Sequence, residues 1–235
     1  MKTILTRLRA DLKAIADPEV KATHQRFFKE EIKAYGIKLP NAKAVGKKFT
    51  KEIKALSKAE VYALCEELWK SGYFEESIIA CDWSYSQRKA AEPEDFRMLE
   101  TWVKTYVTNW ASCDTLCNHT VGEFLIKYPQ FLPELKRWAV SKNRWMRRGA
   151  AVSLIVPARK NLFFDEMLEI ASLQLTDTDD MVQKGYGWML KSAVENNLDA
   201  VYKFVMKHKA VMPRTALRYA IEKMPADKKA KAMEK

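Results

Sequence analysis

Apolar residues recur at helical spacing along most of this chain. In residues 58–70 they fall at positions 61, 64, 65 and 68, a period close to 3.6 residues. Gly72 interrupts the pattern, and residues 75–88 resume it. Pro93 then stands where proline is common, in the first turn of a helix. The pattern predicts a succession of amphipathic helices joined by short turns.

From residue 58 onward the predicted helices group into pairs. The pairs are 58–70 with 75–88, 95–107 with 111–127, 131–141 with 144–157, 163–175 with 179–196, and 198–208 with 213–223. Repeats of about 30–36 residues are typical of α-solenoids of the HEAT type, in which antiparallel helix pairs stack into a curved array. We therefore expect a single domain over residues 1–235, with the repeats in residues 58–225.

The two ends of the chain depart from this repeat. Residues 1–57 predict two or three N-terminal helices, with a turn at Gly36 and Pro40 after the segment 19–35. The segment 43–58 is strongly basic. Residues 226–235 predict a fraying tail, because they are short, polar and terminal.

The composition supports the same fold class. Of 235 residues, 48% are hydrophobic, which excludes intrinsic disorder for most of the chain. Only 7 glycines and 8 prolines are present, too few to supply the many tight turns of a β-sandwich or barrel. Lysine, alanine, leucine, glutamate and methionine are abundant, and all favour helices. The expected fold class is all-α, an α-solenoid of helix pairs.

The charge balance narrows the range of partners. A net charge of +11 and a pI near 9.4 favour a polyanion, either nucleic acid or an anionic membrane surface. Residues 1–15 alternate charged and apolar positions, unlike a signal peptide, and no stretch approaches the roughly 20 apolar residues of a membrane span. The four cysteines lie within apolar patterns, which indicates reduced thiols in a cytoplasmic protein.

Three of the predicted second helices align to place cations in register. The segments RRGAAVSLI, QKGYGWMLK and PRTALRYAI carry Arg148, Lys184 and Arg214 at equivalent positions, each followed by small residues. Stacked repeats bring equivalent positions onto one face, so these cations would form a row near helix N-termini that could bind phosphates. The alternative is that each cation is a solvated surface residue and the small residues only permit close helix packing.

The segment 108–120 holds the densest mixture of reactive side chains. Asp114 falls early in a predicted helix, where a carboxylate also complements the helix dipole. Cys113 and Cys117 share a helix face, but with His119 rotated away they lack the ligands of a zinc site. His119 is also poorly placed to activate Cys113 as a nucleophile. Because no phosphate-loop, dinucleotide-binding, nucleophile-elbow or HExxH motif is present, the carboxylates are left to carry any chemistry.

The tryptophans divide into two groups. Trp69, Trp102 and Trp138 lie at helical spacing on first helices and are expected in the core. Trp110 directly precedes a predicted helix, and Trp188 follows the Lys184–Gly185 pair. Aromatic side chains interleaved with cations suit stacking on the sugars or bases of nucleic acid, although core packing is the commoner role of tryptophan.

Several spaced segments together resemble one known family. These are Trp110 followed by Asp114, the W-M-R-R segment at 145–148, the K-G-Y-G-W-M-L segment at 184–190, and RFFKEEIKAYGI within residues 20–40. In this combination, which covers most of the chain, the sequence resembles the AlkD-type DNA alkylation-repair glycosylases. The segment within residues 20–40 is similar to that family's first helices.

The resemblance implies a fold, an activity and a set of site residues. The implied fold is a right-handed stack of HEAT-like helix pairs with a basic concave face for duplex DNA. The implied activity is hydrolysis of the N-glycosidic bond of cationic N3- and N7-alkylated purines, with no metal or cofactor, by a monomer that binds no membrane. The family works from the DNA backbone and sugar rather than from a base pocket. Asp114 matches the catalytic carboxylate, Trp110 and Trp188 match the two site tryptophans, and Arg148 matches the phosphate-binding arginine.

The sequence departs from the family pattern at two positions. Phe27 stands where relatives have tyrosine, and Lys191 where they can have arginine. Both are expected to contact DNA, and Lys184 and Arg214 are expected to extend the phosphate contacts of Arg148. Two alternatives stay open from the residues alone: a DNA-binding scaffold without catalysis, since some relatives have lost the catalytic residues, and a helical-repeat module for an acidic protein partner.

Overall fold

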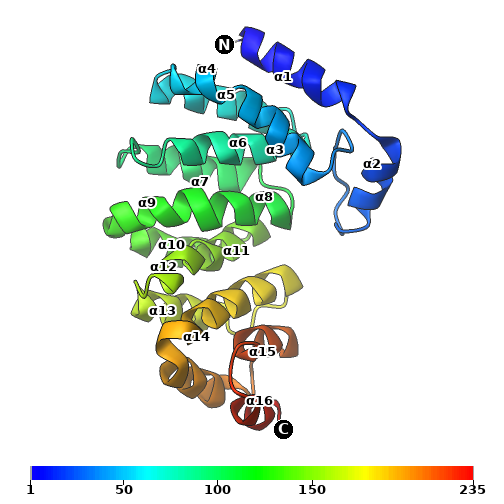
Figure 1. The fold of residues 1–235 in the computed structure, drawn as a ribbon. Helices are drawn as coiled ribbons and strands as arrows, with labels where there is room; N and C mark the ends of the chain where they lie inside the picture. The colour runs from blue at the N-terminus through cyan, green and yellow to red at the C-terminus, as the bar shows by residue number, and fades with distance from the viewer. Residues whose placement is uncertain (1, 235) are drawn as a thin grey trace. The chain divides into compact units, whose positions relative to one another are not determined.

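The computed structural model describes residues 2–234, and helices account for its regular structure (Figure 1). The β-type pairing recorded among these residues is an isolated bridge between Lys33 and Tyr73. The all-α prediction is confirmed. No helix in the described part of the chain is both long enough and apolar enough to cross a membrane.

The chain divides into two compact units, Met1–Leu116 and Cys117–Lys235. The boundary falls inside the helix predicted over residues 111–127. That stretch consists of α8 (Trp110–Thr115), a π-helical segment η1 (Leu116–Val121) and α9 (Gly122–Lys127). In a π-helical turn each backbone hydrogen bond spans five residues instead of four. The extra residue rotates the side chains that follow to a different helix face, and hydrophobic periodicity does not predict such a rotation. Each unit is described separately below.

The first unit begins with four helical segments, where the sequence predicted two or three. The helices of this unit before α8 are α1 (Lys2–Ala14), α2 (Pro18–Gln25), α3 (Leu39–Lys48), α4 (Thr50–Lys54), α5 (Lys58–Lys70), α6 (Phe74–Ser86) and α7 (Asp95–Thr105). The segment predicted over 19–35 is helical only to Gln25, and residues 26–38 form a loop that returns to α3.

Helix α5 shows why the middle of this unit was predictable. Ser57 and Glu60 form a reciprocal capping box at its start, and Gly72, with φ of +70°, follows its end. Between these signals Val61, Leu64, Cys65 and Leu68 are buried, and α5 packs against α6. Trp69 and Trp102 are also buried, as predicted for core tryptophans. Local capping and apolar periodicity therefore agree in this helix.

The second unit contains the remaining helix pairs. Its elements after α9 are η2 (Pro129–Phe131), α10 (Leu132–Ala139), α11 (Arg144–Val152), α12 (Ile155–Arg159), α13 (Phe164–Leu173), α14 (Asp180–His208), α15 (Arg214–Ile221) and α16 (Ala226–Met233). Within the unit α10 packs on α11, α13 on α14, and α14 on α15. Trp138 is buried, as predicted.

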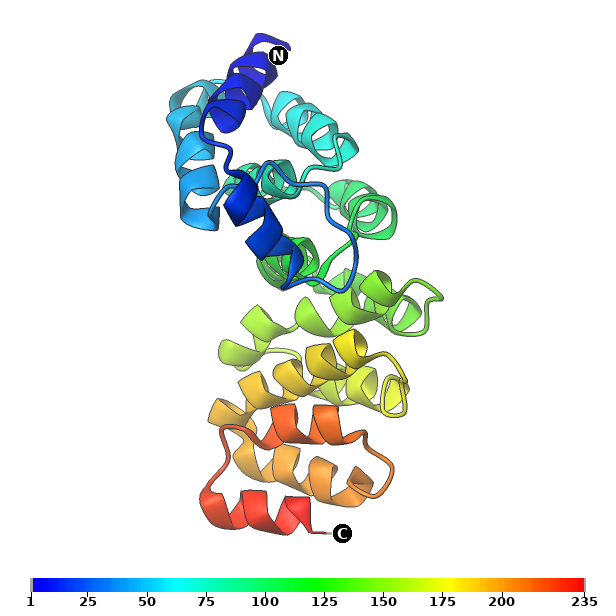
Figure 2. The same ribbon diagram turned by 90° about the vertical axis from the view of Figure 1, so that its right-hand side faces the viewer.

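One predicted boundary in this unit is confirmed and another is wrong. The helices predicted over 179–196 and 198–208 meet within α14 at a kink at Asn197, whose φ of −136° and ψ of 40° are not helical, so the predicted break is confirmed. The predicted tail at 226–235 is instead helix α16, which lies against α14 and α15 at the C-terminal end in both views (Figures 1 and 2). Ala232 of α16 is buried, and Lys209 donates to two of its last carbonyl oxygens, so packing and capping order a polar segment.

Gly187 lies where α14 and α15 approach most closely. A Cβ atom at position 187 would lie 2.6 Å from the Cβ of Tyr219 and 2.8 Å from the Ala216 carbonyl oxygen. We expect Gly187→Ala to lower the free energy of unfolding by roughly 1–3 kcal/mol, because overpacking outweighs the gain of about 1 kcal/mol in helix propensity. Urea denaturation measures the change.

The neighbouring glycine provides the matched control. A Cβ atom at Gly185 would meet the flexible Arg148 side chain, with Cγ at 3.3 Å, and the Arg148 carbonyl oxygen at an ordinary contact distance of 3.7 Å. Gly185→Ala should therefore change stability by less than about 1 kcal/mol. Equal urea denaturation midpoints for Gly187→Ala and Gly185→Ala would contradict the close approach of α14 and α15 at Gly187.

Candidate functional site

Helix α8 carries the tryptophan and the carboxylate that the sequence singled out. Asn109 caps it: its backbone is extended and its side-chain oxygen accepts the Ser112 amide hydrogen at 2.9 Å. Trp110 is the first helical residue and Asp114 follows four positions later, so both lie on one face. Both side chains are partly buried, whereas Cys113 between them is fully buried. The first unit therefore presents an indole and a carboxylate side by side along one helix.

The orientation of Trp110 is set by the loop after α2. Its indole nitrogen donates to the Phe27 carbonyl oxygen at 3.3 Å, and its ring stacks on Phe28 with centroids 5.5 Å apart and planes 26° from parallel. Phe28 packs in turn against Phe74 of α6. Phe27 is 68% exposed, so its backbone holds Trp110 while its ring stays accessible to solvent. The structure thus brings together two residues that the sequence placed in the site, Phe27 and Trp110.

Two buried glutamates of α6 fix this loop to the helices. Glu75 accepts the backbone amide hydrogens of Tyr35, Gly36 and Ile37 at 2.9, 2.9 and 3.0 Å. Gly36 is required there because its φ is +91° and a Cβ atom would lie 2.2 Å from the Asp17 carbonyl oxygen. The negative charge of Glu75 is therefore stabilised by three backbone donors rather than by a cation.

Glu76 makes the second anchor through side chains. It binds the Arg9 guanidinium through both carboxylate oxygens and accepts the Tyr35 hydroxyl at 2.7 Å. The hydrogen bond to Glu76 raises the pKa of Arg9 above its ordinary value, against the opposing effect of burial. Burial, followed by the hydrogen bond to Glu76, raises the pKa of Tyr35. Tyr35 therefore keeps its proton at neutral pH and donates its hydroxyl hydrogen to Glu76.

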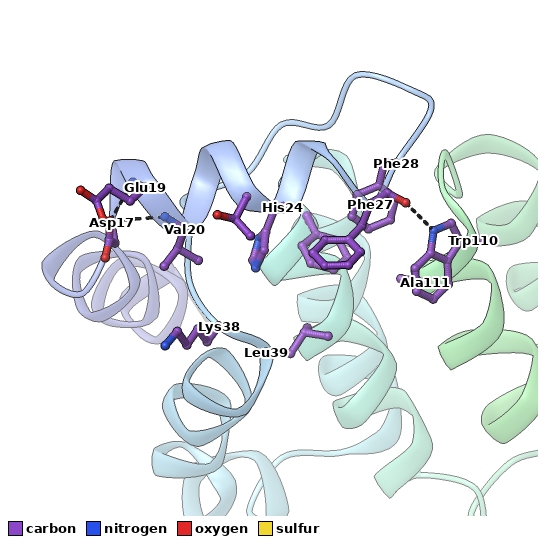
Figure 3. Close-up of a pocket in the computed structure, with 12 residues that line it drawn as sticks. Asp17, Glu19, Val20, His24, Phe27, Phe28, Lys38, Leu39, Trp110 and Ala111 are labelled. Carbon is purple, nitrogen blue, oxygen red and sulfur yellow. Dashed lines mark hydrogen bonds between the residues drawn. The ribbon is translucent and has the colours of Figure 1, made fainter.

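A pocket of about 560 Å³ lies beneath α2 and ends at Trp110 (Figure 3). Val20, His24 and Phe27 point into it from α2 and the start of the loop, and Leu39 lies opposite. Asp17, Glu19, Thr23 and Lys38 supply its polar groups. The family resemblance implies catalysis without a base pocket, so it did not predict this pocket. Asp114 is not among its lining residues, so the pocket adjoins the tryptophan rather than the carboxylate.

In the second unit, α14 presents a stripe of one aromatic and two cationic side chains. Lys184, Trp188 and Lys191 follow one another at spacings of four and three residues and are all partly exposed. Lys184 pairs with Asp180 at 3.2 Å, and Lys191 pairs with Glu222 at 2.9 Å and lies over the Tyr219 ring. These three residues, all predicted to be in the site, share one helix face.

The other two predicted cations have different surroundings. Arg148 of α11 is only 5% exposed: its guanidinium donates to the Met181 carbonyl oxygen, and its side chain packs over Gly185. Arg214 is exposed and donates to the Met233 carbonyl oxygen near the end of α16 at 3.3 Å. Arg148, Lys184 and Arg214 are thus buried, half-buried and exposed in turn, although the sequence aligned them as equivalents. Their roles in DNA binding stay predictions.

The cysteines next to Asp114 are structural in their placement. Cys113 and Cys117 are fully buried, whereas His119 is exposed. Within residues 2–234, no three histidine, cysteine, aspartate or glutamate side chains gather closely enough to hold a metal ion.

A comparison with family models matches residues 8–224 to the DNA alkylation repair enzyme family. The chain belongs to this family. The resemblance inferred from the sequence is confirmed, and with it a place in the repair of alkylated DNA. No significant match was found among curated proteins.

A comparison with solved structures supports the fold. The chain is similar to a predicted DNA alkylation repair enzyme from Enterococcus faecalis, with 19% sequence identity and a TM-score of 0.80 over 90% of this chain and 97% of the other. At this identity the likeness supports the helical fold and not a particular activity.

Sequence reasoning missed the residues that position the site of this DNA alkylation repair protein. Glu75 and Glu76 carried no pattern that marked them, because their partners lie about 40 residues away in the chain. His24 and Phe74 line the pocket and pack edge to face at 5.8 Å. One weak signal was available: E-E directly follows an aromatic residue at the start of a helix whose next turns are largely apolar, and such charges are rarely buried unless they are paired.

Proposed function

We propose that this member of the DNA alkylation repair enzyme family is a DNA glycosylase. Its substrate class is duplex DNA carrying cationic N3- or N7-alkylated purines, and its reaction is hydrolysis of the N-glycosidic bond. One observation carries the proposal: Trp110 and Asp114 lie one helical turn apart on the same face of α8. That pair is the arrangement that a developing positive charge on a sugar requires.

The chemistry follows from the charge of the lesion. An alkylated purine already carries positive charge and leaves without a strong general acid. As the glycosidic bond breaks, positive charge develops on the deoxyribose, as in other glycoside hydrolyses. The Asp114 carboxylate stabilises that charge and orients the attacking water, and the indole face of Trp110 offers a negative quadrupole to the same centre.

The magnitude of this effect is sufficient for catalysis. Two unit charges about 4 Å apart interact by about 4 kcal/mol at an effective dielectric constant near 20. That energy corresponds to roughly a thousandfold in rate. A neutral damaged base is a poorer leaving group, because it carries no positive charge before the glycosidic bond breaks. Selection between lesions would therefore rest on the reactivity of the base.

The second unit contributes the means of holding the DNA. Lys184 and Lys191, on one face of α14, would contact phosphates, and Trp188 between them would contact a sugar. In the first unit Phe27, exposed beside Trp110, would offer an apolar surface to DNA. Arg148 and Arg214 complete the proposed contacts, with Arg148 held in place by its packing on α14.

The direct test is mass-spectrometric detection of free bases after incubation with methylated duplex DNA. We expect release of 3-methyladenine and 7-methylguanine, unchanged by EDTA, and no release of uracil from a uracil-containing duplex. Duplex binding without any released base would contradict the glycosylase and leave a DNA-binding protein. Release of uracil at a similar rate would contradict selection by charge.

A further inference from the structure

The basic segment noted at residues 43–58 contains six lysines, and they fall into two classes. Three make ion pairs: Lys43 with Asp82, Lys48 with Asp11, and Lys58 with Glu92 and Asp95. The others, Lys47, Lys51 and Lys54, are exposed and make no ion pair with any residue that the structure describes. Half of this segment's positive charge is therefore not neutralised by the protein.

Two of these uncompensated lysines line a groove of about 350 Å³ in the first unit. Lys43, Lys47, Thr50 and Lys54 follow one another at spacings of four, three and four residues along α3 and α4, and all line the groove. Lys51 is on the same helical segment but does not line it. The groove thus has one polar wall formed by ammonium groups and a hydroxyl.

The floor and the opposite wall are apolar and firmly held. Gly46 lets α3 approach α6, since a Cβ atom there would lie 3.2 Å from Ile79. The Trp83 indole nitrogen donates to the Gly46 carbonyl oxygen at 3.3 Å, and Ile53 and Tyr85 complete the lining. The Lys43–Asp82 pair, 2.8 Å apart, adds a fixed charge pair to the lining. These contacts hold the groove open without a ligand.

We propose that this groove binds the sugar–phosphate backbone of duplex DNA. Lys47 and Lys54 would pair with phosphates, the Thr50 hydroxyl would donate to a phosphate oxygen, and Tyr85, the partly exposed aromatic residue of the lining, would lie against deoxyribose. The lysines lie seven residues apart across the junction of α3 and α4 at Phe49. At the rise of a helix this is roughly 10 Å, a length over which one DNA strand carries about three phosphates. The inference rests on the DNA-binding part of the proposed function and adds a second place of contact, on helices other than α8.

The mixture of surfaces favours DNA over an acidic protein segment. Carboxylates of a peptide would satisfy the lysines, but they bring no rigid ring at fixed spacing to lie against Tyr85. A sugar–phosphate backbone alternates charge and a sugar ring at each step, which matches a cationic wall beside the partly exposed Tyr85 ring.

The first experiment maps lysine accessibility on the wild-type protein. Lysines are acetylated with and without an undamaged 25-base-pair duplex, and each site is quantified by mass spectrometry. We expect Lys47 and Lys54 to become at least fivefold less reactive with DNA, while Lys51 changes by less than twofold. Equal labelling of Lys47 and Lys54 with and without DNA would overturn the proposal.

The second experiment compares matched variants in DNA affinity. Lys47 and Lys54 are exposed, so the double variant K47A/K54A should fold like the wild type. The control is the double variant K51A/K223A. It also removes two exposed lysines, but neither lines the groove. We expect K47A/K54A to raise Kd by roughly tenfold or more at about 0.1 M salt and to lower the salt slope by one to two, since each phosphate contact contributes about 0.9. The control pair should change Kd by less than threefold.

The outcomes separate this inference from the proposed function. Equal effects of the two double variants on Kd would overturn the groove and leave the glycosylase untouched. A selective effect of K47A/K54A in a protein that releases no base would support the groove and contradict the glycosylase. A wild type with no affinity for the duplex would overturn both.

Discussion

Replacing Asp114 with asparagine is expected to lower the rate of 7-methylguanine release by about a thousandfold, while the affinity for duplex DNA changes little. Asparagine keeps the shape of the side chain and its place on α8, one turn from Trp110. It removes the negative charge and replaces one carboxylate oxygen with an NH₂ group. The loss of about 4 kcal/mol of transition-state stabilisation follows from Coulomb's law at short range. Single-turnover base release, measured with enzyme in excess, isolates this step from binding.

Asp165→Asn is the matched control, because Asp165 is an exposed carboxylate in the first turn of another helix, α13. It should leave base release within about twofold of the wild type, since surface substitutions of this kind have small effects. Full activity in Asp114→Asn would remove Asp114 from the mechanism. Equal losses in affinity and rate would instead indicate that Asp114 helps to hold the DNA.

The largest expected effect on stability comes from Glu75→Gln. Glu75 is fully buried and receives three backbone amide hydrogens from residues 35–37. Glutamine keeps one carbonyl oxygen but turns an NH₂ group toward the Tyr35 amide, so two donors face each other. Leaving a buried donor unsatisfied costs roughly 1–3 kcal/mol, and each hydrogen bond to a charged acceptor contributes about 1.5–3 kcal/mol. We expect a loss of about 3 kcal/mol in the free energy of unfolding.

Glu75 is a positioning residue for Trp110, and a local measurement distinguishes this role from general destabilisation. Hydrogen exchange of the amides at positions 35–37 should accelerate in Glu75→Gln under conditions where the α5 amides remain protected. Base release should fall with it, because the loop that carries Phe27 and Phe28 no longer fixes the indole. Glu169→Gln, which removes an exposed ion pair with Lys136, serves as the control and should cost less than about 1 kcal/mol. Unchanged exchange at 35–37 would contradict the anchoring role.

The helices that sequence reasoning placed well are those whose signals are local. Helix α5 was predicted over the residues it occupies, because its apolar period, its capping box and its terminal glycine all lie within about 15 residues. The core tryptophans were predicted for the same reason. The family resemblance then supplied the pairing of Trp110 with Asp114 and the place of Phe27, which no local rule contains.

The wrong predictions concern segments whose backbone conformation depends on residues that are distant in the sequence. Residues 26–35 have the composition of a helix, yet their backbone hydrogen bonds are replaced by contacts with Gln25, Tyr73 and the buried Glu75. Helix α16 is polar and short, and it forms because Lys209 and Arg214 cap its carbonyl oxygens. Arg148 aligned with two surface cations, but the small residue at Gly185 opens a space that only this arginine fills. Each depends on a contact that sequence spacing does not reveal.

The space over Gly185 couples two positions of the second unit. A methyl group at position 185 would lie 3.3 Å from the Arg148 Cγ, so alanine needs a small adjustment, whereas any bulkier residue would push the arginine away from the Met181 carbonyl oxygen. Beyond alanine, the size of residue 185 therefore controls where the Arg148 guanidinium lies.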